Sequence, residues 1–445
     1  MRGLRDIRYF TLRDLESMPQ LRRLPERWRE EMWAVAHVLP FRVNSYVVDQ
    51  LIDWERIPDD PIFQLTFPQP DMLEPEQRHR VATALAGTSK QAVRDAVAAV
   101  RAELNPHPEG QMTHNVPVLG DEPVPGVQHK YRDTCLVFPS VGQSCHAFCT
   151  YCFRWAQFVG DHDLKFATDR EMRYLDYLRE HVEISDVLFT GGDPMTMRAE
   201  VLARYVEPLL GAEYEHIQTV RIGTKMLSYW PQRVLKDDDA DELLSLLRCL
   251  VSAGKHVAVM AHFSHPRELE TETVRSAVAR LQETGAVIRA QAPLIRHVND
   301  GPDVWAAMWQ VQVRLGIVPY YMFVERDTGS KRYFSVPLSR ALEIHRDATS
   351  RVSGLARTAR GPVMSAHPGK VTVDGITDVG GRRYFVLRLL QARDAEWCGQ
   401  PFLAEYDAHA TWLNELRPAF GDREFFYERE LAHLETVSRS ALVAA

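Results

Sequence analysis

The chain has 445 residues, of which 45% are apolar and 25% charged, so a fibrous or wholly disordered protein is excluded. The 53 Lys and Arg residues against 60 Asp and Glu residues leave a net charge of −7, which argues against general nucleic-acid binding. The sequence contains no apolar run of membrane-spanning length, and residues 1–20 lack the apolar core of a signal peptide. We therefore expect a cytoplasmic protein that binds neither membranes nor nucleic acids.

Helices dominate the predicted N-terminal region, residues 1–126. Residues 24–39 are amphipathic, and residues 74–103 contain two further runs of strong helix formers. Residues 105–126 are rich in Pro and Gly and predict a linker or a wrapping loop. Because this region contains no obvious chemical motif, we expect it to cover or extend a catalytic core.

Strand and helix patterns alternate through residues 127–350. Such alternation predicts an α/β fold with a parallel sheet and right-handed crossovers. Six units suit a partial (β/α)6 barrel, or a doubly wound sheet if the sheet stays open, and the pattern does not separate the two. The expected strands are residues 134–138, 186–190, 219–223, 256–261, 287–291 and 318–324. The expected helices include residues 169–182, 240–253, 271–284 and 302–315.

We expect the alternation to stop near residue 350, leaving residues 351–445 as a small C-terminal α+β region. Residues 371–373 and 384–389 have the composition of strands and flank a Gly-rich turn at residues 379–381. One or two helices are expected within residues 406–443. This region could cap the sheet or form the contact of a homo-oligomer, and the sequence leaves both open.

Three of the six cysteines lie close together, spaced C-x3-C-x2-C: Cys145, Cys149 and Cys152. Clustered cysteines in a large cytosolic chain point to a metal or to catalysis rather than to disulfides. Three thiolates at this spacing can each hold one iron of a [4Fe–4S] cluster and leave the fourth iron open. A structural zinc site is the rival, but it usually needs a second cysteine pair, and Cys249 and Cys398 are isolated. A chance group of buried thiols is the third possibility.

Further motifs follow later predicted strands, at the carboxyl ends where α/β sites occur. The first is Gly191-Gly192-Asp193-Pro194, in which two glycines allow a close backbone approach beside an acid. The others are residues 221–225 (RIGTK) and residues 261–266 (AHFSHP). Each motif alone would usually be an ordinary turn or a buried histidine.

Taken together, the cysteine spacing, the GGDP turn and the sixfold alternation resemble the radical S-adenosylmethionine (SAM) superfamily. The resemblance implies a partial (β/α)6 barrel of radical SAM type. It also implies that the open iron binds the amino and carboxylate groups of SAM, while Gly191, Gly192, Asp193 and Pro194 contact its amino group. Reduction by a donor such as flavodoxin or ferredoxin would then cleave SAM to a 5′-deoxyadenosyl radical that abstracts hydrogen from a small-molecule substrate.

A narrower resemblance, from about residue 60 to about residue 375, is to the lysine 2,3-aminomutase family. It rests on the segments HKYRDTCLVF, RIGTKMLSYWPQRV, MAHFSHPREL, APLIRHVND and VPYYMFVERD. The family also uses pyridoxal phosphate (PLP) and moves an amino group from C2 to C3. The resemblance makes Lys370 the catalytic lysine that binds PLP as a Schiff base, although a turn lysine is more often solvent-exposed. It makes Lys130 a phosphate-binding residue, with Thr134 at the family's second phosphate position.

The resemblance also assigns the substrate end of the site. Arg154, two residues after the third cysteine, matches the arginine that binds the substrate carboxylate. Arg326 and Val363 stand where lysine-specific members have two aspartates, which predicts an amino acid other than lysine, with an acidic end. A shift of this match to the family by one residue would instead bring Glu325 or Asp327 to that position. The family's C-terminal zinc-binding cysteines are missing.

Two alternatives stay open. One is a radical SAM enzyme that works without PLP on an unrelated small molecule. The other is a binding module, without catalytic activity, that is stabilised by zinc or by an iron–sulfur cluster.

Overall fold

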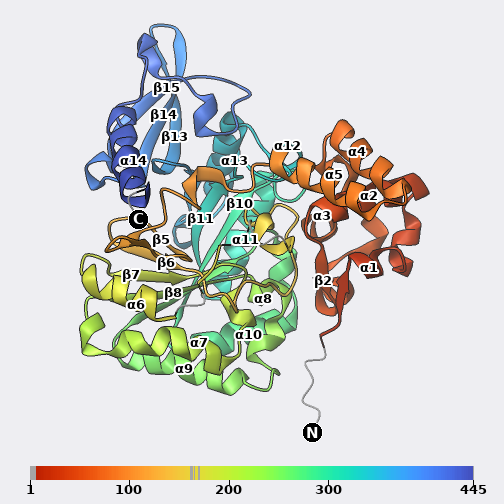
Figure 1. Cartoon of the computed structure of the whole chain (residues 1–445), viewed down its shortest axis with the longest axis horizontal. Helices are drawn as coiled ribbons and strands as arrows, with labels where there is room; N and C mark the ends of the chain where they lie inside the picture. Colours follow the sequence, from red (N-terminus) through yellow and green to blue (C-terminus); the bar gives the residue numbers. More distant parts are fainter. Residues whose placement is uncertain (1–6, 161–163, 165, 169–170, 444–445) are drawn as a thin grey trace.

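The computed structural model describes residues 7–160, 164, 166–168 and 171–443 of the chain (Figure 1). It has an α/β architecture built on one eleven-stranded sheet, whose strands β5 to β15 lie in sequence order. Within the described residues, no helix is both long and apolar enough to cross a membrane.

Seven consecutive strands of this sheet are parallel. They are β6 (Thr134–Val137), β7 (Asp186–Phe189), β8 (Thr219–Thr224), β9 (His256–His262), β10 (Val287–Leu294), β11 (Val318–Val324) and β12 (Arg360–Ser365). The first six are the predicted strands. Connecting helices include α6 (Glu171–Glu180), α7 (Ala199–Val206), α8 (Met226–Tyr229), α9 (Ala240–Ser252), α10 (Glu272–Gln282), α11 (Pro302–Arg314), α12 (Lys331–Phe334) and α13 (Leu338–Ser350). The predicted helix start at Asp169 lies outside the described residues.

The expectation that the alternation stops near residue 350 was wrong by one unit. Helix α13 leads into β12, which pairs in parallel with β11. The segment of β12 reads RGPVMS and has no run of β-branched residues, so its own sequence does not favour a strand. It becomes a strand because β11 and β13 hydrogen-bond to it on both sides.

Antiparallel strands extend both edges of the parallel sheet. Strand β5 (Val127–Tyr131) pairs with β6 at one edge, and β13 (Gly369–Val379), β14 (Arg382–Ala392) and β15 (Pro401–Glu405) continue from β12 at the other. Lys130 Nζ of β5 donates a hydrogen bond to the Ala366 carbonyl between β12 and β13, so β5 approaches this connection on the other side of the parallel strands. The predicted C-terminal strands are therefore part of the same sheet, followed by α14 (Glu428–Val443).

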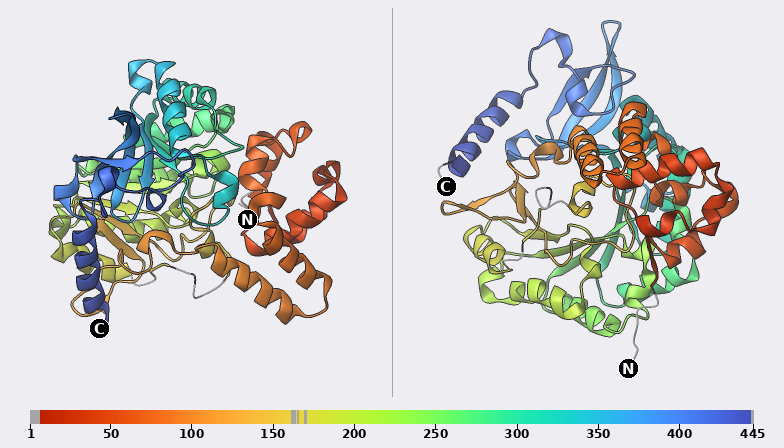
Figure 2. Two further views of the ribbon diagram at one scale, coloured as in Figure 1. Left: turned by 90° about the horizontal axis from the view of Figure 1, so that it is seen from above. Right: turned by 45° about the vertical axis from the view of Figure 1, so that its right-hand side comes forward.

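The N-terminal helices lie to one side of the parallel strands and the β13–β14 hairpin to another (Figures 1 and 2). The N-terminal elements are β1 (Tyr9–Thr11), α1 (Leu12–Leu15), α2 (Glu26–Val38), β2 (Arg42–Asn44), α3 (Pro61–Thr66), α4 (Pro75–Ala86) and α5 (Lys90–Glu103). The short pair β3 (Val118–Leu119) and β4 (Glu122–Pro123) falls in the predicted linker. One hydrophobic core joins the N-terminal helices to the parallel strands, and a second core, from Val324 to Leu431, lies in the C-terminal region.

Candidate active site

The three clustered cysteines lie in the loop that follows β6, residues 138–158, here called the cysteine loop. Each of these residues is half-buried, and burial is the main cause that raises the pKa of each thiol, to about 12 for Cys152. Arg42 of the N-terminal region holds the loop, because its Nη2 donates to Ser144 Oγ at 2.5 Å and to the Cys145 carbonyl. The N-terminal region therefore helps to position the cysteines.

The spacing of the three thiols distinguishes between two kinds of metal centre. Around one zinc ion, with Zn–S bonds of about 2.3 Å, ligand sulfurs lie about 3.8 Å apart. Among the described residues, these thiols do not form a group whose ligand atoms all lie within 4.8 Å of one another. A cluster in which each thiolate binds a different iron tolerates the wider separation, so the loop fits an iron–sulfur cluster better than a single ion.

The GGDP turn, Gly191 to Pro194, packs directly against the cysteine loop. A Cβ added at Gly191 would lie 2.0 Å from Gln143 Nε2, and one added at Gly192 would lie 2.4 Å from the backbone nitrogen of Ser144. Gly191 also has a φ of +139°, which favours glycine. The close approach that these glycines permit is thus to the cysteine loop itself.

Asp193 fixes the turn to two other segments. Its carboxylate accepts hydrogen bonds from Thr224 Oγ1 at 2.7 Å and from the backbone nitrogens of Lys225 and Met195 at 2.9 Å each. Its own backbone nitrogen donates to the Ser144 carbonyl at 2.6 Å. Burial raises the pKa of Asp193 to about 6, against the lowering effect of these hydrogen bonds. The buried residue Pro194 then begins the short turn of helix 194–196.

Arg154 and Arg326 flank one aromatic ring. The guanidinium carbons lie 5.0 and 4.2 Å from the centre of the Phe153 ring, respectively. Arg154 Nη1 approaches the Gly191 carbonyl at 3.4 Å, and Arg326 Nη2 donates to Ser365 Oγ at 2.8 Å. Burial lowers both pKa values, to about 9 for Arg154, and neither guanidinium has an ion-pair partner among the described residues.

A small cavity of about 60 Å³ lies beside these arginines. Three cationic side chains line it (Lys130, Arg154 and Arg326), and Glu109 is the one acidic residue of its lining. The complete lining is Glu109, Gln111, Asn115, Gln128, Lys130, Tyr131, Leu136, Phe153, Arg154, Arg326 and Ser365. Burial, followed by the charges of Arg393 and Arg326, holds the pKa of Lys130 well below its usual value. We call this the basic cavity, and its excess of positive charge suits an anionic ligand.

Contacts of the segment 325–327 show which of its residues faces the basic cavity. Glu325 is buried and does not line the basic cavity, and Asp327 forms an ion pair with Lys331 at 3.0 Å. Arg326 is therefore the residue of this segment that faces the cavity. Val363 is fully buried in β12 and does not line the cavity, and neither does Thr134, which hydrogen-bonds to Asp133.

Lys370 lies at the start of β13, close to the basic cavity but outside its lining. Its Nζ donates to Gln391 Oε1 at 2.6 Å and lies 5.3 Å from the ring of Tyr131, which does line the cavity. It also lies 5.0 Å from the Tyr321 ring. Burial, assisted by Arg221 and Arg360, lowers the pKa of Lys370 to about 7. The lysine is thus buried and poised to be neutral, not a solvent-exposed turn residue.

Arg393 is a residue of this region that the sequence did not reveal. It holds the loop before Lys370, because its Nε donates to the His367 carbonyl at 2.9 Å.

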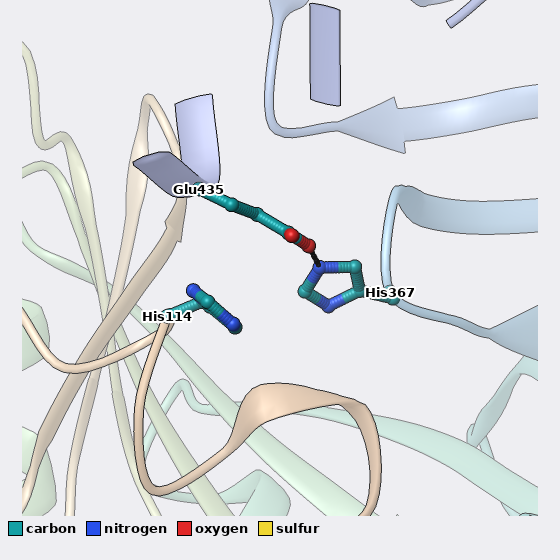
Figure 3. A group of neighbouring side chains, drawn as sticks. All are labelled: His114, His367 and Glu435. Atoms are coloured by element: carbon teal, nitrogen blue, oxygen red, sulfur yellow. Dashed lines mark hydrogen bonds and ion pairs between the residues drawn. The ribbon is translucent and has the colours of Figure 1, made fainter. Parts of the chain in front are cut away.

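His367 itself hydrogen-bonds through Nε2 to Glu435 of α14, and His114 lies beside it (Figure 3). These three side chains lie within metal-ligating reach of one another, but Arg393 Nη2 is 3.4 Å from His367 Nδ1. A guanidinium beside the same imidazole disfavours a metal cation, so we interpret the group as a structural clamp.

The chain is similar in sequence to known aminomutases. No protein-family model matches the chain. It is 32% identical over 392 residues to a putative L-lysine 2,3-aminomutase of Aquifex aeolicus, covering 88% of this chain and 91% of that protein. It is 30% identical to the L-lysine 2,3-aminomutase of Clostridium subterminale and 28% identical to the glutamate 2,3-aminomutase of Clostridioides difficile. These alignments cover 53% and 54% of each chain, respectively.

Among solved structures, a radical SAM methyltransferase from Sphaerobacter thermophilus overlaps with a TM-score of 0.38 and 16% identity, over 53% of this chain and 68% of that one. The α/β sheet, the cysteine loop and the relatives together define a radical SAM enzyme, a class whose cofactors are a [4Fe–4S] cluster and SAM. Within that class, the chain belongs to the lysine 2,3-aminomutase family. The resemblance predicted from the sequence is confirmed.

Proposed function

We propose that this protein is a PLP-dependent radical SAM aminomutase, an isomerase that acts on an amino acid with an acidic side chain. The observation that carries the proposal is the basic cavity, whose lining sets three half-buried basic side chains against a single carboxylate. A lysine substrate would bring a further ammonium group to this surplus of positive charge, whereas a dicarboxylic amino acid would neutralise it.

The cysteine loop supplies the cluster ligands in this proposal. Cys145, Cys149 and Cys152 would each bind one iron, and the GGDP turn beside them would receive the amino group of SAM. When bound, the cluster and SAM supply the radical that removes hydrogen from the substrate, and PLP supplies the conjugated system that carries the migrating amino group. The protein residues bind, orient and shield these groups.

Lys370 and Lys130 fit the demands of PLP. Covalent attachment needs a neutral amine, and the pKa of about 7 leaves a large fraction of Lys370 neutral at physiological pH. Lys130 Nζ would donate to the phosphate, whose negative charge favours the protonated amine, and Arg393 adds a positive charge close by. The charge of Arg393 would offset the loss of the family's second phosphate-binding residue at Thr134.

Arg154 and Arg326 would hold the two ends of the substrate. Each guanidinium offers a fork of donors that matches a carboxylate, and both lie against the Phe153 ring, which keeps them near each other. Arg154, beside the GGDP turn, would hold the α-carboxylate. Arg326, anchored on Ser365, would face the side-chain carboxylate.

The proposal extends to the shape of the sheet, the cellular compartment, the electron donor and the oligomeric state. The sheet would form a partial barrel around the site, and the enzyme would work in the cytoplasm with electrons from a donor such as flavodoxin or ferredoxin. Contact through the C-terminal region would allow a homo-oligomer.

One observation favours a second candidate, a radical SAM enzyme without PLP. Lys370 already hydrogen-bonds to Gln391 and is not part of the cavity lining. In that case the basic cavity would bind a different anionic substrate directly.

The test is a panel of the twenty amino acids, incubated anaerobically with the reconstituted protein, SAM, PLP and dithionite, and analysed for β-amino acids by mass spectrometry. We expect β-amino products from glutamate or aspartate and none from lysine. Conversion of lysine would overturn the substrate proposal. Release of 5′-deoxyadenosine without any β-amino product, from a protein that binds no PLP, would favour the second candidate.

A further inference from the structure

Cys149 differs from the other two clustered cysteines in its neighbours. Helix α8, which follows the RIGTK motif, ends at Tyr229, and the Tyr229 hydroxyl lies 3.5 Å from Cys149 Sγ. The Tyr229 side chain is buried, with 1% of the residue exposed. Among the described residues, no other hydrogen-bond partner of this hydroxyl is found, so the contact with Cys149 is its way of satisfying a buried polar group.

We propose that Tyr229 donates a hydrogen bond to the cluster-bound thiolate of Cys149 and thereby raises the reduction potential of the [4Fe–4S] cluster. The proposal rests on the proposed ligand role of Cys149. A metal-bound thiolate carries no proton, so the hydroxyl has to be the donor. A hydrogen bond to a cluster sulfur stabilises the negative charge added on reduction, which makes the cluster easier to reduce.

Lys225 strengthens this donor. Its ammonium lies 4.7 Å from the centre of the Tyr229 ring and pairs with Glu268 at 2.5 Å. A cation against the ring withdraws electron density from the phenol and makes its O–H a better donor.

In the part of the chain that the structure describes, no side-chain hydroxyl is hydrogen-bonded to the sulfur of Cys145 or Cys152. Cys145 lies near the buried Asp193 carboxylate, which disfavours a thiolate, and Arg42 bonds to the carbonyl of Cys145, not to its sulfur. Cys152 receives a hydrogen bond from the backbone of Arg154. Tyr151 also lies near Cys149, but its hydroxyl is shared with Ser264 Oγ at 3.1 Å. Among the described residues, Tyr229 is thus the buried hydroxyl whose hydrogen-bond partner is one of the three cysteines.

The experiment measures the midpoint potential of the reconstituted full-length protein by EPR-monitored redox titration. Tyr229→Phe is expected to shift the midpoint to more negative values at an unchanged iron content of about four per chain. Tyr46→Phe is the matched control, because it removes another buried hydroxyl, one bonded to Thr271 Oγ1 at 2.7 Å, and should leave the midpoint unchanged. An unshifted midpoint in fully loaded Tyr229→Phe would overturn the proposal.

A second variant covers the case in which Tyr229→Phe fails to load iron. Site-specific replacement of Tyr229 by 3,5-difluorotyrosine keeps the shape and makes the phenol a stronger donor, so the midpoint should become less negative. A difluorotyrosine protein with the unmodified midpoint would overturn the proposal. Full iron retention by Cys149→Ala would instead show that the proposed ligand set is wrong, whatever the result at Tyr229.

Discussion

The cysteine loop with its GGDP turn and the basic cavity beside Lys370 are held together differently. In the first region, backbone packs on backbone, with Gly192 against Ser144 and the Asp193 carboxylate buried among three donors. In the second, long charged side chains from β5, the cysteine loop, the end of β11 and the N-terminal linker converge on a small space. The contrast teaches that the proposed cluster end is specified by close packing and the proposed substrate end by charge. Variants in the first region should therefore lose iron loading or stability, and variants in the second should change substrate specificity.

Removing a cluster ligand should have the largest effect. Cys149→Ala is expected to lose nearly all bound iron and all SAM cleavage, because each thiolate would hold one iron of the cluster in the proposed site. Cys249→Ala is the control, since Cys249 is an exposed residue of α9. Iron analysis and 5′-deoxyadenosine release measure the two outcomes. Equal iron loss in both variants would contradict the ligand assignment.

Gly192→Val tests whether packing fixes the cluster end. Its Cβ would collide with the Ser144 backbone, which has no flexible side chain to move away, so we expect poor iron loading and a loss of stability of about 2 kcal/mol or more. Gly375→Val is the control, because a Cβ there meets nothing within 4 Å. If Gly192→Val loaded iron normally and lost only SAM binding, the packing account would be wrong.

Lys370→Ala should abolish covalent PLP attachment. The readout is the absorbance band of the Schiff base, which borohydride removes. Lys236→Ala is the control, because Lys236 is exposed, and this variant should keep the band. Attachment needs the neutral amine, and the pKa of Lys370 is about 7. Attachment should therefore fall as pH drops through about 7, whereas an unperturbed lysine would need a pH above about 10. A pH profile centred near 10 would argue against burial as the cause of reactivity.

Arg326→Asp should have the mildest effect, a change of substrate preference without loss of the cluster. Losing a charge-assisted hydrogen bond to a carboxylate costs about 1.5–3 kcal/mol, so kcat/KM for an acidic substrate should fall by roughly 10- to 100-fold. The variant should admit basic amino acids better than the unmodified protein does. Arg332→Asp changes a largely exposed arginine and serves as the control. Equal losses in both variants would remove Arg326 from the specificity site.

The sequence alone determined the features that depend on neighbours along the chain. The six parallel strands were predictable because apolar runs alternated with helical periods, and the cysteine motif was predictable because its spacing is local. The segments around Lys130, Arg154, Arg326 and Lys370 were singled out by their resemblance to segments of the lysine 2,3-aminomutase family. Each of these features lies within a few consecutive residues.

Only the tertiary structure decided the rest. Strand β12 exists because two neighbouring strands pair with it, not because RGPVMS favours a strand. Glu109, Arg393 and Tyr229 come from segments far from the residues that they serve, so no sequence pattern links them to the site. The depressed pKa of Lys370 likewise follows from burial by distant strands. Long-range packing sets which charges are buried together, and burial is what turns ordinary lysines and arginines into a candidate active site.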